Sequence, residues 1–396
     1  MFGTLAIVVA AGLAGPALAA GRRPLAPVVV GELLAGVVLG RTGFRVIDIG
    51  SSPAFPVFYA VGFAMLMMTA GTHVDVAKPD FQHGAKRGAL ALAVAAVVAV
   101  PTGFLIHAVL GVGSFPLFAV LLAGSSAAVA FPIIEERHLS GSPIPLLIAW
   151  IALADSTTVV LVPLTLTGAH DLVPSVLGDA AIVIVGLGLY LAVALVFRRV
   201  DEEAMWDVSK QRGWGLQLRL SVLLLLVLGS IADRTGASIL VAGFLAGMLL
   251  VRLREGHRLE IQLVGVANGF LVPIFFVLLG ARIDLRALAQ SPAAIGVALA
   301  MATGAVVVHL AAAAVAGQER RIASGLAASA QLGLPAAAAS LGLASHRLSP
   351  AIAAALVAAG CLTLIPASVG GMMLAEGAES GKAAGANGPR KGRRSA

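Results

Sequence analysis

Residues 146–166 read LLIAWIALADSTTVVLVPLTL, an apolar run long enough to cross a lipid bilayer that carries one carboxylate, Asp155, near its middle. A charged side chain at the centre of a bilayer costs on the order of 2.5–3.5 kcal/mol even on the most lenient insertion scale, so such residues are rare and usually functional. We therefore interpret Asp155 as a functional group. The structural alternative is a buried aspartate that caps or pairs with a neighbouring helix.

The composition of the whole chain is typical of a membrane protein. Of its 396 residues, 59% are hydrophobic and only 12% are charged, and the mean hydropathy is +0.97. A soluble protein of this length needs more charge to cover its surface. Lys and Arg lie between the apolar runs and near the C-terminus, as in a topology signal, so we expect no nucleic-acid partner. The single cysteine, Cys361, excludes an internal disulfide framework.

Apolar windows of bilayer-spanning length predict an all-α polytopic membrane protein with about thirteen transmembrane helices. The loops on one side carry many more Lys and Arg residues than those on the other, so the positive-inside rule predicts an N-terminus outside and a C-terminus inside. Residues 1–20 resemble a signal peptide, but no basic residue precedes the apolar run, which favours an uncleaved first helix. The predicted windows are residues 2–20, 25–40, 54–72, 87–110, 114–135, 143–166, 172–197, 216–232, 236–252, 261–281, 291–316, 321–345 and 349–374.

Two short motifs recur at nearly the same spacing. LLAGVVLGR at 33–41 matches FLAGMLLVR at 244–252, and AGTHVDV at 70–76 matches LGARIDL at 279–285, so both offsets are about 210 residues. An odd number of predicted crossings separates the copies, so the second copy enters the membrane from the opposite side. This pattern predicts an inverted-topology repeat, an architecture in which secondary transporters place their site near the midplane between the halves.

The repeat predicts how the chain is divided. We expect a membrane domain and then a disordered basic cytoplasmic tail that is rich in small and polar residues. The expected boundaries are 1–374 for the membrane domain, with 1–170 as the first repeat with the N-terminal helices, 171–200 as the linking helix and 214–374 as the second repeat, and 375–396 for the tail.

Helix-breaking residues fall at matching positions of the two halves. AGSSAAVAFP at 123–132 and, about 210 residues later, QLGLPAAAAS at 331–340 interrupt their apolar windows. Interrupted membrane helices in corresponding positions indicate a binding site, because their ends present backbone groups and helix dipoles to a ligand. We therefore predict two broken helices that cross. The breakers are Gly124, Pro132, Gly333 and Pro335.

A buried carboxylate can hold a proton or a desolvated cation, but it holds both poorly, and this competition is the minimal requirement of an antiporter. The candidate cation ligands are Asp155 and nearby hydroxyls, because oxygen ligands suit hard cations. The hydroxyls of a helix can equally bond back to its own carbonyls. His309 is a candidate charge partner, with a packing histidine as the alternative. The predicted proton- and cation-binding residues are Asp155, Ser125, Ser126, Ser156 and Thr157.

Five segments in this order resemble the monovalent cation:proton antiporter superfamily, and most closely its Kef-like and NapA-like branch. They are GELLAGVVLG at 31–40, SSAAVAFPIIEERHL at 125–139, WIALADSTTVV at 150–160, ILVAGFLAGMLL at 239–250 and PIFFVLLGARIDL at 273–285. The resemblance implies an NhaA/NapA-like fold with a core transport domain, a dimerisation domain and a homodimer. It also implies that Asp155 is the essential acid and that Ser125–Ser126 lie in an unwound crossing.

Two departures from the family pattern affect the expected mechanism. Many members carry a second acidic or amide residue directly before the essential aspartate, where this chain has Ala154, and many carry a lysine or arginine in a later core helix, where this chain offers only His309. The first departure predicts one-for-one, electroneutral exchange. The second leaves open what balances Asp155 when no ion is bound. Relatives of the potassium-efflux type carry a cytoplasmic regulatory domain, so a separate cytoplasmic regulatory subunit is a candidate partner.

The sequence therefore predicts a transporter, not an enzyme, that exchanges Na⁺ or K⁺ for H⁺ across the cytoplasmic (inner) membrane and needs no cofactor. Asp155 would bind the transported cation as well as the proton. A sodium- or proton-coupled symporter of organic solutes on a related fold is the alternative, although this sequence lacks basic residues near the predicted crossing. An intramembrane aspartyl protease would need a second aspartate on a facing helix, and Asp179 is predicted near the headgroup boundary.

Overall fold

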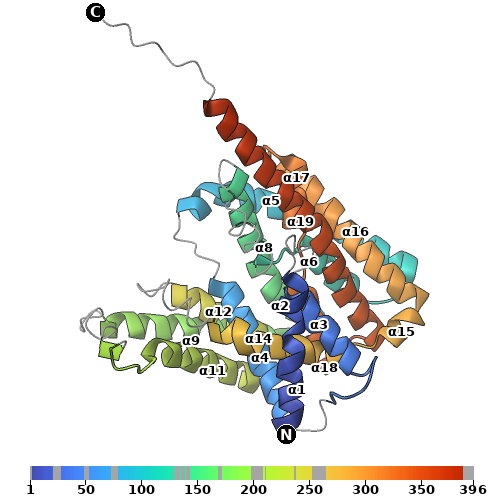
Figure 1. Ribbon diagram of the computed structural model, residues 1–396. Coiled ribbons are helices and arrows are strands. Elements are labelled where there is room, and N and C mark those ends of the chain that lie inside the picture. The colour runs from blue at the N-terminus through green and yellow to red at the C-terminus, as the bar shows by residue number, and fades with distance from the viewer. Residues whose placement is uncertain are drawn as a thin grey trace, which may run out of the picture.

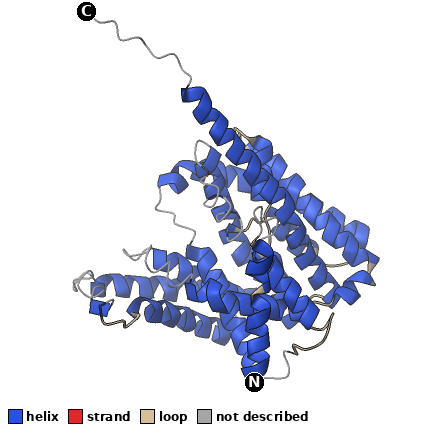
Figure 2. Ribbon diagram, in the orientation of Figure 1, coloured by secondary structure: helices blue, strands red, loops and turns tan. Residues whose placement is uncertain are grey.

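The computed structural model describes residues 2–20, 28–48, 53–72, 79–127, 143–167, 172–197, 211–235, 238–251 and 265–386, together with a few isolated positions between them. Every regular element in this part of the chain is a helix, and no strand occurs in it (Figure 2). Seven of the described helices are long and apolar enough to cross a membrane, and four shorter apolar helices accompany them. The predicted all-α polytopic fold is confirmed, while the number of crossings stays a prediction.

The helices follow the predicted windows in order along the chain (Figure 1). The first window is divided into two helices, and the tenth contains a π-helical turn, η2. The bounds are α1 Phe2–Gly12, α2 Ala14–Ala19, α3 Val28–Leu39, α4 Ala54–Thr72, α5 Pro79–Leu110, α6 Phe115–Ala123, α8 Pro143–Leu166, α9 Leu172–Phe197, α11 Leu216–Thr235, α12 Ile239–Val251, η2 Ala267–Leu271, α14 Val272–Arg282, α15 Leu285–Ala289, α16 Pro292–Val315, α17 Arg321–Ala328, α18 Gly333–Ala344 and α19 Pro350–Ala386.

The helices pack into two groups. The scaffold group consists of α1–α4, α9, α11, α12 and α14, and the core group consists of α5, α6, α8 and α16–α19. Figure 1 shows the core group around α5, α16 and α19 and the scaffold group around α4, α12 and α14. The groups touch mainly where α8 meets α12 and α9.

Two glycine pairs join the halves of the repeat inside the scaffold group. An added Cβ on Gly36 of α3 would overlap the backbone of α14 and lie 3.0 Å from the Cα of Gly280, and one on Gly71 of α4 would lie 3.1 Å from the Cα of Gly247 in α12. Without side chains, these helices approach to backbone contact, as membrane helices with small residues do. In each pair, a residue of one repeated motif faces a residue of the other motif: 33–41 packs on 279–285, and 70–76 packs on 244–252. This exchange is what an inverted repeat requires.

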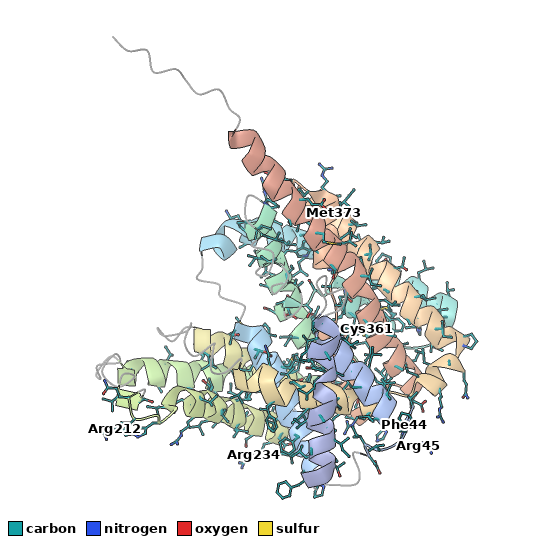
Figure 3. The ribbon with its side chains drawn as sticks, in the orientation of Figure 1. Phe44, Arg45, Arg212, Arg234, Cys361 and Met373 are labelled. Carbon is teal, nitrogen blue, oxygen red and sulfur yellow. The ribbon has the colours of Figure 1, made fainter. Side chains whose placement is uncertain are left out.

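Basic residues lie at the ends of helices and outside the bundles. Figure 3 labels Arg45, which follows α3, together with Arg212 and Arg234, which lie before α11 and in its last turn. All three side chains are exposed. Their peripheral position agrees with the reading of the basic residues as a topology signal.

The last helix is longer than we expected from the sequence. α19 continues to Ala386, whereas the last apolar window ends at residue 374. The predicted start of the disordered tail, at residue 375, therefore lies within a helix. Residues 375–386 are rich in Ala and Gly, and the alanines favour helix strongly enough to extend the preceding regular turns.

Candidate ion-binding site at the crossing of two broken helices

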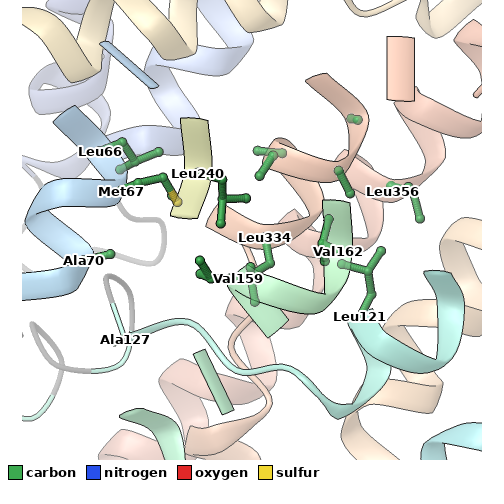
Figure 4. Close-up of a cluster of buried hydrophobic side chains, with 14 of the residues drawn as sticks. Leu66, Met67, Ala70, Leu121, Ala127, Val159, Val162, Leu240, Leu334 and Leu356 are labelled. Atoms are coloured by element: carbon green, nitrogen blue, oxygen red, sulfur yellow. The ribbon is translucent and has the colours of Figure 1, made fainter. Parts of the chain in front are cut away.

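The first broken helix is interrupted after α6. Its C-cap residue, Gly124, has extended backbone angles, and Ser125 and Ser126 are also non-helical. The N–H of Ala130 then donates to the carbonyl of Ser126 (3.0 Å), so a new helical turn begins at Ala127. In Figure 4 the chain leaves the helix that carries Leu121 and runs without helical turns toward Ala127. The helix thus ends at Gly124, one of the two breakers predicted here, and the other, Pro132, lies outside the described residues.

The second broken helix is interrupted between α17 and α18. α17 ends at Ala328, and α18 begins at Gly333 with Pro335 in its first turn. Proline is tolerated there because the first N–H groups of a helix have no intrahelical acceptor. The second break therefore lies between Ala328 and Gly333, in the half of the chain that mirrors the first.

The two breaks touch each other through hydrogen bonds. The N–H of Ser126 donates to the carbonyl of Ala330 (2.8 Å), and the hydroxyl of Ser125 donates to the carbonyl of Ala328 (2.7 Å). In the opposite direction, Nε2 of Gln331 donates to the carbonyl of Gly124 (2.7 Å). The interrupted helices leave these backbone carbonyls without partners inside the helix. A carbonyl without a hydrogen bond is costly in low-polarity surroundings, and these bonds supply the missing donors. The predicted crossing is present.

Asp155 of α8 lies at this crossing. Its side chain is 4% exposed, and its Oδ2 accepts a hydrogen bond from the N–H of Ala127 (3.1 Å). Ala127 is the first helical residue after the first break, and backbone N–H groups at the start of helical structure favour negative charge. Within the described part of the chain, no Lys or Arg pairs with Asp155. The carboxylate thus has one neutral donor and an uncompensated charge.

The hydroxyls beside Asp155 on α8 point back to their own helix. Ser156 donates to the carbonyl of Ala152 (2.7 Å), and Thr157, which is exposed, donates to the carbonyl of Leu153 (2.7 Å). The two hydroxyls therefore bond back to carbonyls of their own helix, which was the alternative to cation binding. Thr158, which we did not predict, is buried, and its methyl carbon would contact a Cβ added to Gly124. Its position three residues after Asp155 puts it on the same helix face.

The two serines of the first break differ in their bonding. The Ser125 hydroxyl is committed to Ala328 as a donor, although its oxygen lone pairs can still accept or coordinate. The Ser126 hydroxyl is buried and donates no hydrogen bond within the described residues. A Cβ added to Gly333 would lie 3.6 Å from the Ser126 Oγ, so this hydroxyl faces the second break. Among the predicted ligands, Ser126 and Asp155 have the most oxygen capacity left for an ion.

His309 of α16 packs behind the first break. Its ring stacks on Trp150 of α8 with 5.3 Å between centroids, and its Nδ1 lies 2.8 Å from the carbonyl of Ala305. The Gly124 backbone lies beside the ring, but Nε2 has no hydrogen-bond partner of good geometry among the described residues. No described contact joins the imidazole to Asp155. These contacts support packing, and a role as charge partner stays a prediction.

Sequence reasoning missed two polar residues of the crossing, Gln331 and Thr363. Gln331 is 3% exposed, and its backbone N–H donates to the Thr363 hydroxyl (3.0 Å). That hydroxyl is buried in α19, where it also donates to the carbonyl of Gly360 (2.7 Å). The available signal was position: Gln331 lies two residues before the breaker Gly333, and Thr363 follows Asp155 by about the length of the repeat.

Asp179 serves as a structural cap. Its Oδ1 accepts a hydrogen bond from the N–H of Ser238 (3.2 Å) directly before α12, which ties α9 to that helix. No described contact brings Asp179 to Asp155, so the paired carboxylates of an aspartyl protease do not occur in the described residues. These residues also contain no cluster of three or more His, Cys, Asp or Glu side chains suited to a resident metal.

An apolar contact between the two helix groups lies next to the crossing. Figure 4 shows Leu66 and Met67 of α4 with Leu240 of α12 on one side, and Leu334 of α18 with Val159 of α8 on the other. All of these side chains are buried. The crossing is therefore bounded on the scaffold side by groups that hold no fixed charge.

Comparison with known proteins places this arrangement in a family. The family model of the transmembrane sodium/hydrogen exchangers matches residues 6–375. YjbQ of Bacillus subtilis, provisionally named as an Na⁺/H⁺ antiporter, is 27% identical over 286 residues, which cover 67% of this chain and 44% of that protein. The glutathione-regulated potassium-efflux protein KefC of an Enterobacter species is 25% identical over 282 residues, which cover 67% of this chain and 42% of that protein. The chain thus spans less than half the length of these two relatives.

A solved structure shares the fold over nearly the whole length. The sodium/proton antiporter MjNhaP1 of Methanocaldococcus jannaschii superposes with a TM-score of 0.64 at 17% identity, covering 96% of this chain and 97% of that one. At this identity the likeness concerns the fold. Together with the family model and the crossing of two broken helices, it allows the chain to be classified. The chain belongs to the sodium/hydrogen exchanger family, a family of multi-pass membrane transporters.

Proposed function

We propose that this chain exchanges a monovalent cation, Na⁺ or K⁺, for H⁺ across the cytoplasmic membrane by alternating access, with Asp155 binding either ion. The observation that carries the proposal is the environment of this carboxylate. It is buried at the crossing of two broken helices and receives one hydrogen bond, from Ala127, with no basic partner in the described residues.

The exchange follows from the electrostatics of that position. An isolated carboxylate in a low-polarity interior is strongly unfavourable unless its charge is neutralised. A proton or a cation can neutralise it, and the binding of one removes the charge that attracts the other. A cation would be held by Asp155 and by nearby oxygens such as that of Ser126, because hard cations prefer oxygen ligands.

A single carboxylate also sets the proposed stoichiometry. One proton and one monovalent cation carry the same charge, so the loaded site is neutral on both halves of the cycle. We infer one-for-one, electroneutral exchange. The apolar contact between α4, α12, α8 and α18 supports movement of the core group against the scaffold group, because its aliphatic side chains make no directional bonds with one another.

The surroundings of the transporter are proposed on the same basis. We infer a homodimer in the inner membrane with the N-terminus outside and the C-terminus inside. Names of relatives include both sodium and potassium, so both cations stay candidates, and regulation by a separate cytoplasmic subunit stays open. The symporter alternative is not favoured. An organic anion would need a basic side chain at the crossing, and no described Lys or Arg pairs with a group there.

Proton flux in proteoliposomes tests the proposal. Purified protein is reconstituted with a pH-sensitive dye inside, and Na⁺ or K⁺ is added outside. Asp155→Asn keeps the shape and loses the ionisation, so cation-driven proton release should disappear. Asp179→Asn is the matched control, because its amide oxygen can still accept from Ser238. Undiminished exchange in Asp155→Asn would exclude the carboxylate mechanism, and a rate that follows membrane voltage would exclude the stoichiometry.

A further inference from the structure

The two breaks hold each other through a reciprocal pair of side-chain hydrogen bonds. From the first break, the Ser125 hydroxyl reaches the Ala328 carbonyl at the end of α17 (2.7 Å). From the second break, the Gln331 amide reaches the Gly124 carbonyl at the end of α6 (2.7 Å) and lies 3.5 Å from the Leu122 carbonyl. Each side chain therefore caps the C-terminal end of the other broken helix.

Equivalent positions on two core helices support the breaks. In the first half, Asp155 of α8 accepts from the backbone N–H of Ala127 (3.1 Å). In the second half, Thr363 of α19 accepts from the backbone N–H of Gln331 (3.0 Å) and is itself fixed by a bond to the Gly360 carbonyl (2.7 Å). The backbone arrangement is similar in the two halves, but only one of them carries an ionisable side chain.

The donors at the crossing are neutral, which matters for the ion. The C-terminal ends of α6 and α17 each carry partial negative charge and lie near the Asp155 carboxylate. A lysine or arginine that capped these carbonyls would bring a positive charge to the crossing. Gln331 and Ser125 satisfy the carbonyls and add no charge, so the negative potential of the crossing is left for a proton or a cation.

We propose that Gln331, held in place by Thr363, is a positioning residue that sets the cation affinity of the Asp155 site. Its amide fixes the Gly124 carbonyl, and that residue begins the non-helical segment that ends at Ala127, the hydrogen-bond donor to Asp155. Loss of the amide frees this segment to shift against the carboxylate. The inference rests on the proposed function, because it concerns the affinity of the same site.

Substitutions at Gln331 and at one buried control test this role. Gln331→Met keeps the length of the side chain and removes the amide. Gln318→Met makes the same change at another buried glutamine, which is 2% exposed and lies at the turn between α16 and α17. The half-saturating cation concentration and the maximal rate of proton flux are measured in proteoliposomes for Na⁺ and for K⁺, at several pH values.

We expect Gln331→Met to raise the half-saturating concentration about five- to tenfold, as loss of one buried hydrogen bond implies, with a maximal rate within about twofold of the wild type. Gln318→Met should leave both quantities within about twofold. Thr363→Val should act like Gln331→Met, and Thr363→Ser, which keeps the hydroxyl, should restore the affinity. Combining Gln331→Met with Thr363→Val should add little, because both changes act through the same contact.

Several outcomes would overturn the positioning role. An unchanged half-saturating concentration in Gln331→Met would exclude it, and so would an equal loss in Gln331→Met and Gln318→Met, because that result indicates general destabilisation. If Gln331→Met does not fold, Thr363→Val against Thr363→Ser decides the question alone. Failure of the proposed function is distinguishable, because wild-type vesicles would then show no cation-driven proton flux at all.

Discussion

Gly247→Ala should destabilise the protein through a clash that the surrounding helices cannot avoid. A Cβ at this position of α12 would overlap the backbone carbonyl of Met68 and lie 2.9 Å from the Cα of Gly71 in α4. Ordinary van der Waals contact of a Cβ begins near 3.4 Å. A carbonyl within a helix has no rotamer that moves it aside, so the two helices must separate by about 1 Å.

The size of the effect follows from two opposing contributions. Forcing an extra methyl group into a well-packed contact costs about 1–3 kcal/mol. Alanine favours helix over glycine by roughly 0.5–1 kcal/mol, which offsets part of this loss. We therefore expect Gly247→Ala to lower the free energy of unfolding by about 1–2 kcal/mol. The mirrored pair, Gly36 and Gly280, should respond in the same way, because an added Cβ on either residue meets the facing backbone.

Thermal unfolding of purified protein in detergent measures the difference. Gly229→Ala in α11 is the control, because nothing lies within 4 Å of the Cβ that it would add, and its midpoint should equal or exceed that of the wild type. The double variant Gly71→Ala/Gly247→Ala should lose less than the sum of the single losses, since one separation of α4 and α12 accommodates both methyl groups. If Gly247→Ala and Gly229→Ala have the same midpoint of thermal unfolding, the inferred backbone contact between the two halves of the repeat is refuted.

Three further results are expected. If a proton and a cation compete for Asp155, each unit decrease of pH should raise the half-saturating cation concentration by about tenfold over the range in which the ion-free carboxylate is protonated, and a pH-independent value would contradict competition. Thr158→Val, like Thr157→Val, should leave the cation affinity unchanged, because both hydroxyls donate to carbonyls of α8 itself and valine keeps the methyl group that faces the first break; weaker cation binding in Thr158→Val alone would show that the Thr158 hydroxyl reaches the ion. Thr42→Val removes the hydroxyl that donates to the Ile283 carbonyl (2.7 Å) and accepts from the Leu285 N–H (3.0 Å), so the protein should lose about 1–2 kcal/mol of stability while its cation affinity is unchanged, as unfolding and flux measurements can check.

Much of the fold could be predicted because it depends on patterns that single helices carry. Apolar length marks a membrane helix whatever it packs against, and the repeated motifs around Gly36 and Gly71 recur because two halves use the same backbone contact. Asp155 could be singled out because an uncompensated acid in an apolar run is unfavourable without a function. In these cases the physical cause and the sequence signal lie in the same short segment.

The remaining parts of the site depend on how segments far apart in the chain meet. Whether the hydroxyls of Ser156 and Thr157 face an ion or their own helix depends on the rotation of α8 against the breaks, which apolar periodicity does not determine. Gln331 and Thr363 have only their position in the repeat as a sequence signal, because their partners lie on other helices and the crossing alone brings them together. The extension of α19 past residue 374 depends on intrinsic helix propensity, which a window of apolar length does not register.

The symmetry of the backbone and the asymmetry of the side chains have separate consequences. An inverted repeat provides two conformations related by exchange of the halves, so the site can open to either side without a dedicated gate. That symmetry does not require an ion-binding residue in both halves of the repeat. Asp155 and Thr363 occupy corresponding places beside the two breaks, and each accepts a backbone N–H, but only the aspartate can lose a proton. In the exchange that we propose, the repeat therefore provides alternating access, whereas the number of ions moved in each cycle is set by which of the two positions carries an acid.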